Sequence, residues 1–257
     1  MILVAASLRH VILLSCRPGL KSANIRAMNE QVLTKNIAKL LQRVRRVAEK
    51  SQYSNGAVLL VAASKTRPSQ DVRAAHACGL TDFGESYLQE ALQKMGELED
   101  LPLVWHFIGP IQSNKTAGIA THFDWVHSID RAKIAKRLSE QRPPELPPLQ
   151  VCLQVNISGE VSKSGVSLKE LPQLAHAVLE LPYLKLRGLM AVPAAEADSQ
   201  QLQAAFRQMR DALAQLQLLD PGIDTLSMGM SADMDTAIME GATMIRLGTA
   251  IFGTRNR

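Results

Sequence analysis

Aromatic residues, cysteines and long apolar runs are all scarce in this chain of 257 residues. Phenylalanine, tryptophan and tyrosine make up only 4% of it, yet 46% is hydrophobic and 21% is charged, which is typical of a globular protein and not of a disordered one. The longest apolar stretches near the start, residues 1–8 and 11–14, are separated by Arg9 and His10. Each is far shorter than the roughly 18 residues that a membrane-spanning helix requires, so we expect no membrane segment.

The three cysteines are too few and too widely spaced for a disulfide framework or a metal centre. Cys16, Cys78 and Cys152 form no C-x-x-C pair, and an odd number cannot be fully paired within one chain. This usage indicates a reducing compartment, so we expect a cytoplasmic protein without a metal site. Cys78 and Cys152 are interpreted as small buried hydrophobic residues.

Acidic residues are absent from residues 1–27, which carry Arg9, Arg17, Lys21 and Arg26. The chain has 29 basic and 24 acidic residues and a formal net charge of +5, but without these four the remainder has 25 basic against 24 acidic. The basic character therefore belongs to the leader, and we expect no nucleic-acid partner. The leader resembles a transit peptide in composition, but we favour a dispensable segment, disordered or preceding a functional start at Met28. Residues 28–257 are predicted to form one domain.

Strand-like and helical patterns alternate along the rest of the chain. Strands are predicted at residues 58–64, 82–85, 104–109, 124–128, 150–156, 185–192, 224–229 and 244–252, and helices near 29–51, 70–78, 87–98, 114–121, 131–141, 168–180, 199–218 and 232–241. About eight such steps in a chain of this length predict the α/β class and a single (β/α)8 TIM barrel, with a doubly wound open sheet as the alternative. The proline-rich residues 143–148 are interpreted as a stiff loop within this rhythm.

Local patterns refine several of these elements. The first helix should bury one face formed by Ile37, Leu40, Leu41 and Val44, and the helix at 199–218 should bury a stripe. That stripe consists of Leu202, Ala205, Phe206, Met209, Leu213 and Leu216. Ser86 and Ser167 each precede Gln or Glu by three residues, which predicts a capping box at the start of a helix.

Lys65 directly follows the apolar run at residues 58–64 and is itself followed by Thr66, Arg67 and Pro68. In a barrel, a side chain at this end of a strand emerges where ligand sites are built. In partly apolar surroundings a lysine has more of its neutral amine, which can form a Schiff base with an aldehyde. By position alone a solvated lysine is the simpler interpretation, so other residues must decide.

One segment after the seventh strand and one on the eighth suit a phosphate group. Residues 228–233 and 246–249 contain Ser231, Gly248 and Thr249, and barrels frequently bind phosphate at these two loops. Taken alone, Ser231 could simply cap a helix, and Gly248 could relieve crowding in a strand. Arg246 is expected between the Lys65 amine and this phosphate site, and an arginine beside a pyridine nitrogen would keep that nitrogen unprotonated and restrain carbanion chemistry.

Eight motifs together resemble one known family. They are VAASKT at 61–66, FGESY at 83–87, WHFIGPIQSNK at 105–115, NIS at 156–158, SKSG at 162–165, RGLM at 187–190, SMGMSAD at 227–233 and RLGTAIFG at 246–253. Over roughly residues 28–255 the chain is similar to the pyridoxal phosphate homeostasis protein family, also called the proline synthetase co-transcribed family. The run at 106–115 is highly specific to it.

The resemblance implies a barrel like the N-terminal domain of alanine racemase, with pyridoxal 5′-phosphate (PLP) held as an internal aldimine on Lys65. It assigns the phosphate contacts to Ser231, Gly248 and Thr249, the pyridine-nitrogen contact to Arg246, and the ring pocket to His106, Asn156 and Met190. It assigns no catalytic residue. The chain departs from the family at Ser86, where Asn is usual, which puts a direct contact of Ser86 with the cofactor in doubt.

The expected function is that of a non-enzymatic PLP-binding protein for intracellular vitamin B6 homeostasis, which regulates PLP or delivers it to PLP-dependent apoenzymes as a monomer. The alternative is an amino-acid racemase of the alanine racemase type. Such racemases take a second base, a tyrosine, from a C-terminal domain, and here the chain ends at Arg257 soon after the eighth strand. Of Tyr53, Tyr87 and Tyr183, only Tyr87 is predicted near the site. A phosphate-binding scaffold without aldehyde chemistry is a third possibility.

Overall fold

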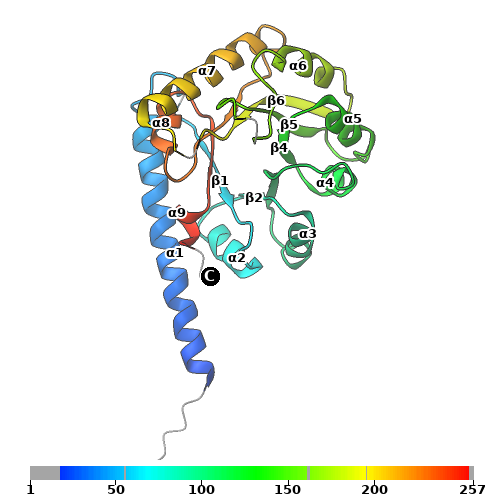
Figure 1. Ribbon diagram of the computed structural model, residues 1–257. Coiled ribbons are helices and arrows are strands. Elements are labelled where there is room, and N and C mark those ends of the chain that lie inside the picture. The colour runs from blue at the N-terminus through cyan, green and yellow to red at the C-terminus, as the bar shows by residue number, and fades with distance from the viewer. Residues whose placement is uncertain (1–17, 55, 161–162, 195, 255–257) are drawn as a thin grey trace, which may run out of the picture.

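Eight parallel strands close into a barrel in the computed structural model, which describes residues 18–54, 56–160, 163–194 and 196–254 (Figure 1). The strands pair in chain order, and β1 also pairs with β8, which closes the ring. They are β1 Leu59–Ala63, β2 Asp82–Glu85, β3 Val104–Phe107, β4 Trp125–Ile129, β5 Leu149–Val155, β6 Leu184–Ala191, β7 Thr225–Ser227 and β8 Met244–Leu247. The predicted TIM barrel is confirmed, and the doubly wound sheet is wrong.

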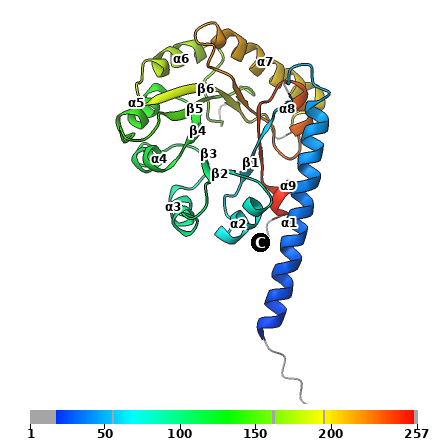
Figure 2. The ribbon, with the colours of Figure 1, turned by 180° about the vertical axis from the view of Figure 1, so that it is seen from behind.

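Helices cover the outside of this barrel, as Figures 1 and 2 show from opposite sides. They are α1 Pro18–Ala48, α2 Ser69–Ala77, α3 Leu88–Glu97, α4 Thr116–His122, α5 Ala132–Glu140, α6 Leu171–Leu179, α7 Ser199–Gln217, α8 Met234–Met239 and α9 Thr249–Phe252. The strand predicted at 244–252 is too long, because β8 ends at Leu247 and residues 249–252 are helical. Residues 143–148 connect α5 to β5, as predicted for a loop inside the domain.

The barrel strands are buried on both faces, as expected for a parallel sheet covered by helices. Their outward side chains, such as Phe83 and Val126, are fully buried between the sheet and the helices. On α7 the predicted stripe is buried at Phe206, Met209, Leu213 and Leu216. Leu202 of the same stripe is partly buried against the core.

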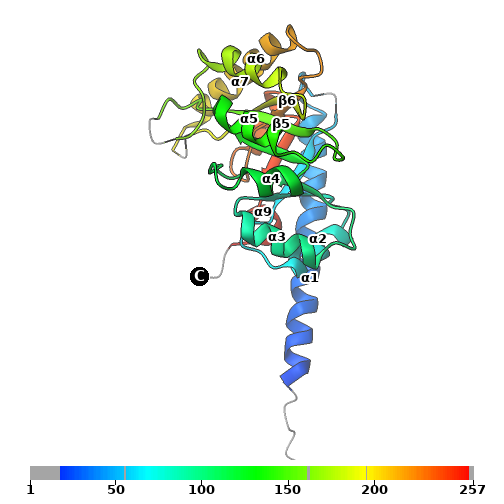
Figure 3. The ribbon, with the colours of Figure 1, turned by 90° about the vertical axis from the view of Figure 1, so that its right-hand side faces the viewer.

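Helix α1 begins earlier than the sequence predicted. The helix runs without interruption from Pro18, whereas the prediction began it near residue 29. Proline suits the first turn of a helix because the N–H groups of that turn have no acceptor within the helix. Helix α1 packs against α2, α8 and α9, and its N-terminal turns extend past the barrel (Figure 3). Ile37, Leu40 and Val44 are buried as predicted, but Leu41 is 41% exposed. The rest of the predicted leader, residues 1–17, lies outside the described residues.

The two predicted capping boxes have different outcomes. The Ser167 hydroxyl bonds Glu170, and each of these residues accepts a hydrogen bond from the backbone N–H of the other, in the turn before α6. Ser86 does not cap α3, which begins after Tyr87 without a side-chain cap. The Ser86 hydroxyl is buried with no hydrogen-bond partner among the described residues, so this prediction is wrong.

Candidate functional site

A cavity of about 390 Å³ opens at the carboxyl ends of the strands, where β1 and β8 meet. Its size is within the range of small-molecule sites. Its polar lining comes from Lys65 and Arg67 after β1, Ser231 after β7, and Arg246, Gly248 and Thr249 at β8 and the start of α9. Its apolar lining comes from Ala63, Ile108, Val192, Met230 and Ala232. One cavity therefore collects an amine, two guanidinium groups, two hydroxyls and a glycine.

Lys65 reaches this cavity because it follows β1 by two positions, so that its half-buried side chain continues the inward row of the strand. The next residue, Thr66, has a φ of +65°, a left-handed conformation that is uncommon for a β-branched residue. The backbone N–H of Arg67 donates to the carbonyl of Ser64 and closes a tight turn. Strain of this kind persists only where neighbouring contacts hold it in place.

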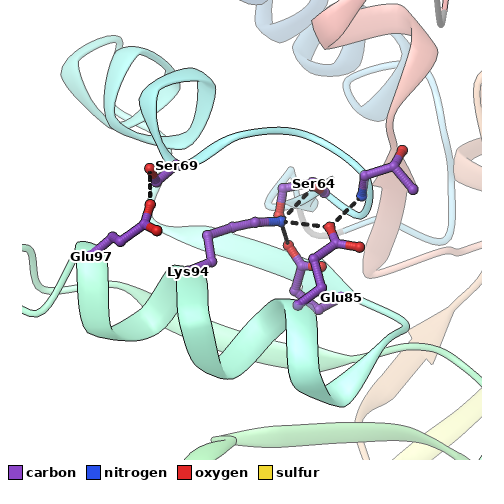
Figure 4. A network of polar contacts seen from close by, with 7 residues as sticks. Ser64, Ser69, Glu85, Lys94 and Glu97 are labelled. Atoms are coloured by element: carbon purple, nitrogen blue, oxygen red, sulfur yellow. Dashed lines mark hydrogen bonds and ion pairs between the residues drawn. The ribbon is translucent and has the colours of Figure 1, made fainter.

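Those contacts come from helix α3 through Lys94 (Figure 4). The Lys94 amine extends toward β1 and donates to the Ser64 carbonyl at 2.9 Å, to Glu85 Oε1 at 2.5 Å and to Glu90 Oε1 at 3.1 Å. Glu90 Oε1 in turn accepts the backbone N–H of Thr66 at 2.5 Å. Helix α3 thereby holds both sides of the turn that presents Lys65.

Glu85 is the buried centre of this network. Its Oε1 also accepts the Ser64 hydroxyl at 2.6 Å, whereas its Oε2 is buried with no hydrogen-bond partner among the described residues. Burial raises the pKa of Glu85, although Lys94 and Ser64 act in the opposite direction. The three N–H donors of Lys94 bond Ser64, Glu85 and Glu90. The network therefore holds the backbone at the end of β1 in place, and Lys94 does not line the cavity.

The opposite wall consists of the loops after β7 and β8. Ser231 lines the cavity and does not cap α8, because Asp233 is the residue that precedes that helix, and Asp233 Oδ1 accepts the Met230 N–H. Gly229 has a φ of +98°, and a Cβ there would lie 2.7 Å from Ala237, so only glycine fits this turn. Gly248 and Thr249 stand at the start of α9, where the first N–H groups of a helix lack internal acceptors.

Arg246 enters the cavity from β8 although only 6% of it is exposed. Its Nη1 donates to the Ser227 carbonyl at 2.6 Å and to the Ser227 hydroxyl at 2.7 Å, and its Nη2 donates to the Ala191 carbonyl at 3.0 Å. Burial lowers the pKa of Arg246 to about 10, which leaves the side chain charged at neutral pH. A rigidly held cation therefore faces the cavity.

Three residues assigned by resemblance lie outside the cavity lining. His106 is fully buried inside the barrel, where it contacts Asp82 and His127. Met190 is buried on β6, one position before the Ala191 carbonyl that accepts from Arg246. The Asn156 amide donates to two loop carbonyls, those of Glu160 and Lys163.

Sequence reasoning missed Arg67, which lines the cavity, lies over the Phe252 ring at 5.7 Å and donates to the Gly253 carbonyl at 2.5 Å. Its place in the turn directly after β1 was the available signal, because the segments that follow barrel strands build the ligand site. His127 was also missed. It lies on β4 and bonds both His106 and Ser227, a contact that no local pattern could indicate.

The cavity can bind an anionic aldehyde but offers little for proton transfer. Lys65 supplies the amine, while the two arginines and the hydroxyls suit an anion. Among the described residues that line it there is no histidine, carboxylate, cysteine or tyrosine. Tyr87 is 57% exposed at the start of α3 and is not part of the lining.

In the ranges that the structure covers, no three or more His, Cys, Asp or Glu side chains are grouped so that they could hold a metal ion. None of the helices in those same ranges combines the length and apolarity needed to cross a membrane.

Comparison with known proteins agrees with the fold and the motifs. The sequence profile of the alanine racemase N-terminal domain matches residues 35–256. The pyridoxal phosphate homeostasis protein of Pseudomonas aeruginosa is 60% identical over 224 residues, which cover 87% of this chain and 96% of that protein. The protein of the same name from Escherichia coli K12 is 50% identical over 224 residues, 86% of this chain and 96% of that protein.

Solved structures of related proteins share this fold. PipY of Synechococcus elongatus PCC7942, solved with PLP bound, is 37% identical with a TM-score of 0.73, and the match covers 86% of this chain and all of that one. Alanine racemase of Corynebacterium glutamicum shares the fold at 21% identity and a TM-score of 0.62, over 86% of this chain and 60% of that one. The chain belongs to the pyridoxal phosphate homeostasis protein family, whose barrel is that of the alanine racemase N-terminal domain.

Proposed function

We propose that this protein binds PLP in the cavity between β1 and β8, holds it as a Schiff base on Lys65 and acts in vitamin B6 homeostasis. The observation that carries the proposal is the meeting of Lys65, Arg246 and Ser231 in one cavity of suitable size. The PLP-bound structure of PipY, at 37% identity, supports the same ligand class.

In this proposal the residues have separate tasks. The Lys65 amine attacks the aldehyde carbon, the aldehyde oxygen leaves as water, and a C=N bond remains. Ser231, Gly248 and Thr249 bind the phosphate, where hydroxyl and backbone donors are available. Arg246 meets the pyridine nitrogen, whereas His106, Met190 and Asn156, which the resemblance assigned to the ring pocket, do not line the cavity and are given no contact with the ring.

The residues of the cavity favour binding of PLP over catalysis with it. A cation at Arg246 keeps the pyridine nitrogen unprotonated, which weakens the ring as an electron sink. The described lining also lacks the second base that a racemase needs on the opposite ring face. We therefore propose a non-enzymatic carrier that supplies PLP-dependent apoenzymes as a monomer.

The test is the visible spectrum of the purified, PLP-loaded protein before and after borohydride. We expect a yellow protein whose near-visible band is lost on reduction, with mass spectrometry locating the adduct on Lys65. Lys65→Ala should abolish the band, whereas Lys136→Ala, which removes an exposed lysine of α5, should retain it. An adduct on another lysine would refute the assignment.

The racemase alternative has its own measurement. A racemase exchanges the α-proton of alanine for solvent deuterium at catalytic rates, and we expect no such exchange from the PLP-loaded protein. Exchange that disappears in Lys65→Ala would overturn the non-enzymatic assignment.

A further inference from the structure

A row of hydrogen bonds crosses the barrel interior beneath the cavity. It links the Arg246 guanidinium to the Ser227 hydroxyl at 2.7 Å, and the same hydroxyl to His127 Nδ1 at 2.7 Å. It continues from His127 Nε2 to His106 Nδ1 at 2.9 Å, and from His106 Nε2 to Asp82 Oδ1 at 3.0 Å. We name these five residues the barrel relay.

The barrel relay joins strands that are not neighbours. Asp82, His106 and His127 lie on the consecutive strands β2, β3 and β4, whereas Ser227 and Arg246 lie on β7 and β8. The bond between His127 and Ser227 therefore spans the interior of the closed barrel. Both imidazole rings are fully buried, so water does not compete for these contacts.

With both rings neutral, the chemistry of the two ends allows one direction of donation. Arg246 has only donors, so Ser227 Oγ accepts from it, and Asp82 as a carboxylate has only acceptors, so His106 Nε2 donates to it. A neutral His106 then accepts at Nδ1 from His127 Nε2–H. A neutral His127 in turn accepts at Nδ1 from the Ser227 hydroxyl. The four ring nitrogens and the Ser227 hydroxyl all have a partner when both rings are neutral Nε2–H tautomers.

The charges that face the row agree with this state. Burial is the main cause that holds the pKa of His127 well below its usual value, and the nearby charge of Arg246 acts in the same direction. Burial acts to raise the pKa of Asp82, but hydrogen bonds from His106 and Thr81 outweigh it, and the net shift is downward.

The remaining strands place a neutral thiol and an ion pair near the row. Burial raises the pKa of Cys152 on β5 to about 12, which keeps the thiol neutral. Arg187 on β6 pairs with Asp224 at 2.7 Å and lies over the Trp125 ring, which stacks on His106. Asp233, after β7, also attracts Arg246.

We propose that the barrel relay is a one-way row of donors in which Ser227, His127 and His106 are positioning residues for Arg246, connecting its charge to the Asp82 carboxylate. Within the described residues no carboxylate forms an ion pair with Arg246. The Arg246 guanidinium instead donates to the Ser227 hydroxyl oxygen, whose own proton is donated to His127. Arg246 is thereby aimed at the cavity, a role that rests on the proposed function.

The first test needs no cofactor. Two-dimensional ¹⁵N–¹H spectra of the histidine rings in the unliganded full-length protein at pH 7 should show His106 and His127 as neutral Nε2–H tautomers. Donation in the reverse direction would give Nδ1–H tautomers, and a charged ring would carry protons on both nitrogens. Either result would overturn the proposal.

The second test interrupts the row at Ser227. Ser227→Ala should weaken PLP binding about tenfold, since it removes one acceptor of a charged group, and Ser227→Thr should restore most of it. The His127 Nδ1 resonance should move to that of an imine nitrogen without a hydrogen bond in Ser227→Ala alone. Ser139→Ala is the matched control, because it removes an equally buried hydroxyl on α5, outside the barrel interior.

The outcomes separate this inference from the proposed function. If the wild-type protein fails to bind PLP, the proposed function is wrong, while the tautomers still decide the direction of the row. If it binds PLP and Ser227→Ala, shown to be folded by its melting curve, binds equally well, the positioning role is wrong.

Discussion

At the scale of single residues, the buried ion pair of Lys94 and Glu85 should be sensitive to substitution. Both side chains are almost fully buried, and the pair holds the turn that presents Lys65. Removing one partner of such a pair leaves an uncompensated charge in the interior, which is more damaging than losing the pair as a whole.

We therefore predict that Lys94→Met lowers the free energy of unfolding by about 3–5 kcal/mol, measured by urea denaturation. Lys136→Met is the control, because its partner Glu140 is 3.8 Å away and both side chains are exposed, so a change of at most about 0.5 kcal/mol is expected. Equal effects of the two substitutions would contradict this account.

Single residues also show how far the sequence predicts the site. Lys65, Ser231, Arg246, Gly248 and Thr249 were predicted as binding residues, and the structure brings all five to one cavity, because the ends of barrel strands converge. The buried row through His127 could not be predicted. Its partner Ser227 is 100 positions away, and no local pattern encodes a contact across the barrel interior.

At the scale of elements, the approach of β6 to β7 requires a glycine. A Cβ at Gly188 would lie 1.8 Å from the carbonyl oxygen of Thr225, and backbone cannot yield as a flexible side chain can. Gly96, in α3, has open space around its missing Cβ and an ordinary helical position. The two glycines are opposites, one required by packing and the other dispensable.

The prediction is that Gly188→Ala lowers the free energy of unfolding by about 2–4 kcal/mol, while Gly96→Ala raises it by about 0.5–1 kcal/mol. Urea denaturation of both variants measures this difference. A stable Gly188→Ala protein would mean that β6 and β7 separate at little cost.

Element boundaries were predicted less well than the elements themselves. The apolar run at 244–252 looked like one strand, because the period of a short apolar segment does not distinguish a strand end from a short helix. Helix α1 continues back to Pro18 because nothing between residues 18 and 28 breaks a helix apart from one glycine, and the prediction relied on Met28 as a start. Ser86 failed as a cap because the chain leaves β2 in a turn that buries its hydroxyl.

At the scale of the whole molecule, stability should depend on pH through His127. Its pKa is lowered in the folded protein, whereas in the unfolded chain it returns to its usual value of 6.5. Below that value the unfolded state binds a proton that the folded state does not, so stability falls as the pH falls.

Between pH 7.5 and 5.5 the wild-type protein should lose about 1.4 kcal/mol more stability than His127→Gln, which cannot titrate. Urea denaturation at several pH values gives both curves, and the comparison of slopes is independent of the variant's own stability. Parallel curves would show that His127 takes up a proton inside the barrel.

The pairing of β1 with β8 has a consequence for how the protein is made. The amine of Lys65 comes from the opening strand, while Arg246, Gly248 and Thr249 come from the last one. A chain still being synthesised has its lysine long before it has the opposite wall. The cavity comes into being only after β8 has emerged from the ribosome and joined β1, so no nascent chain that stops short of β8 can contain it.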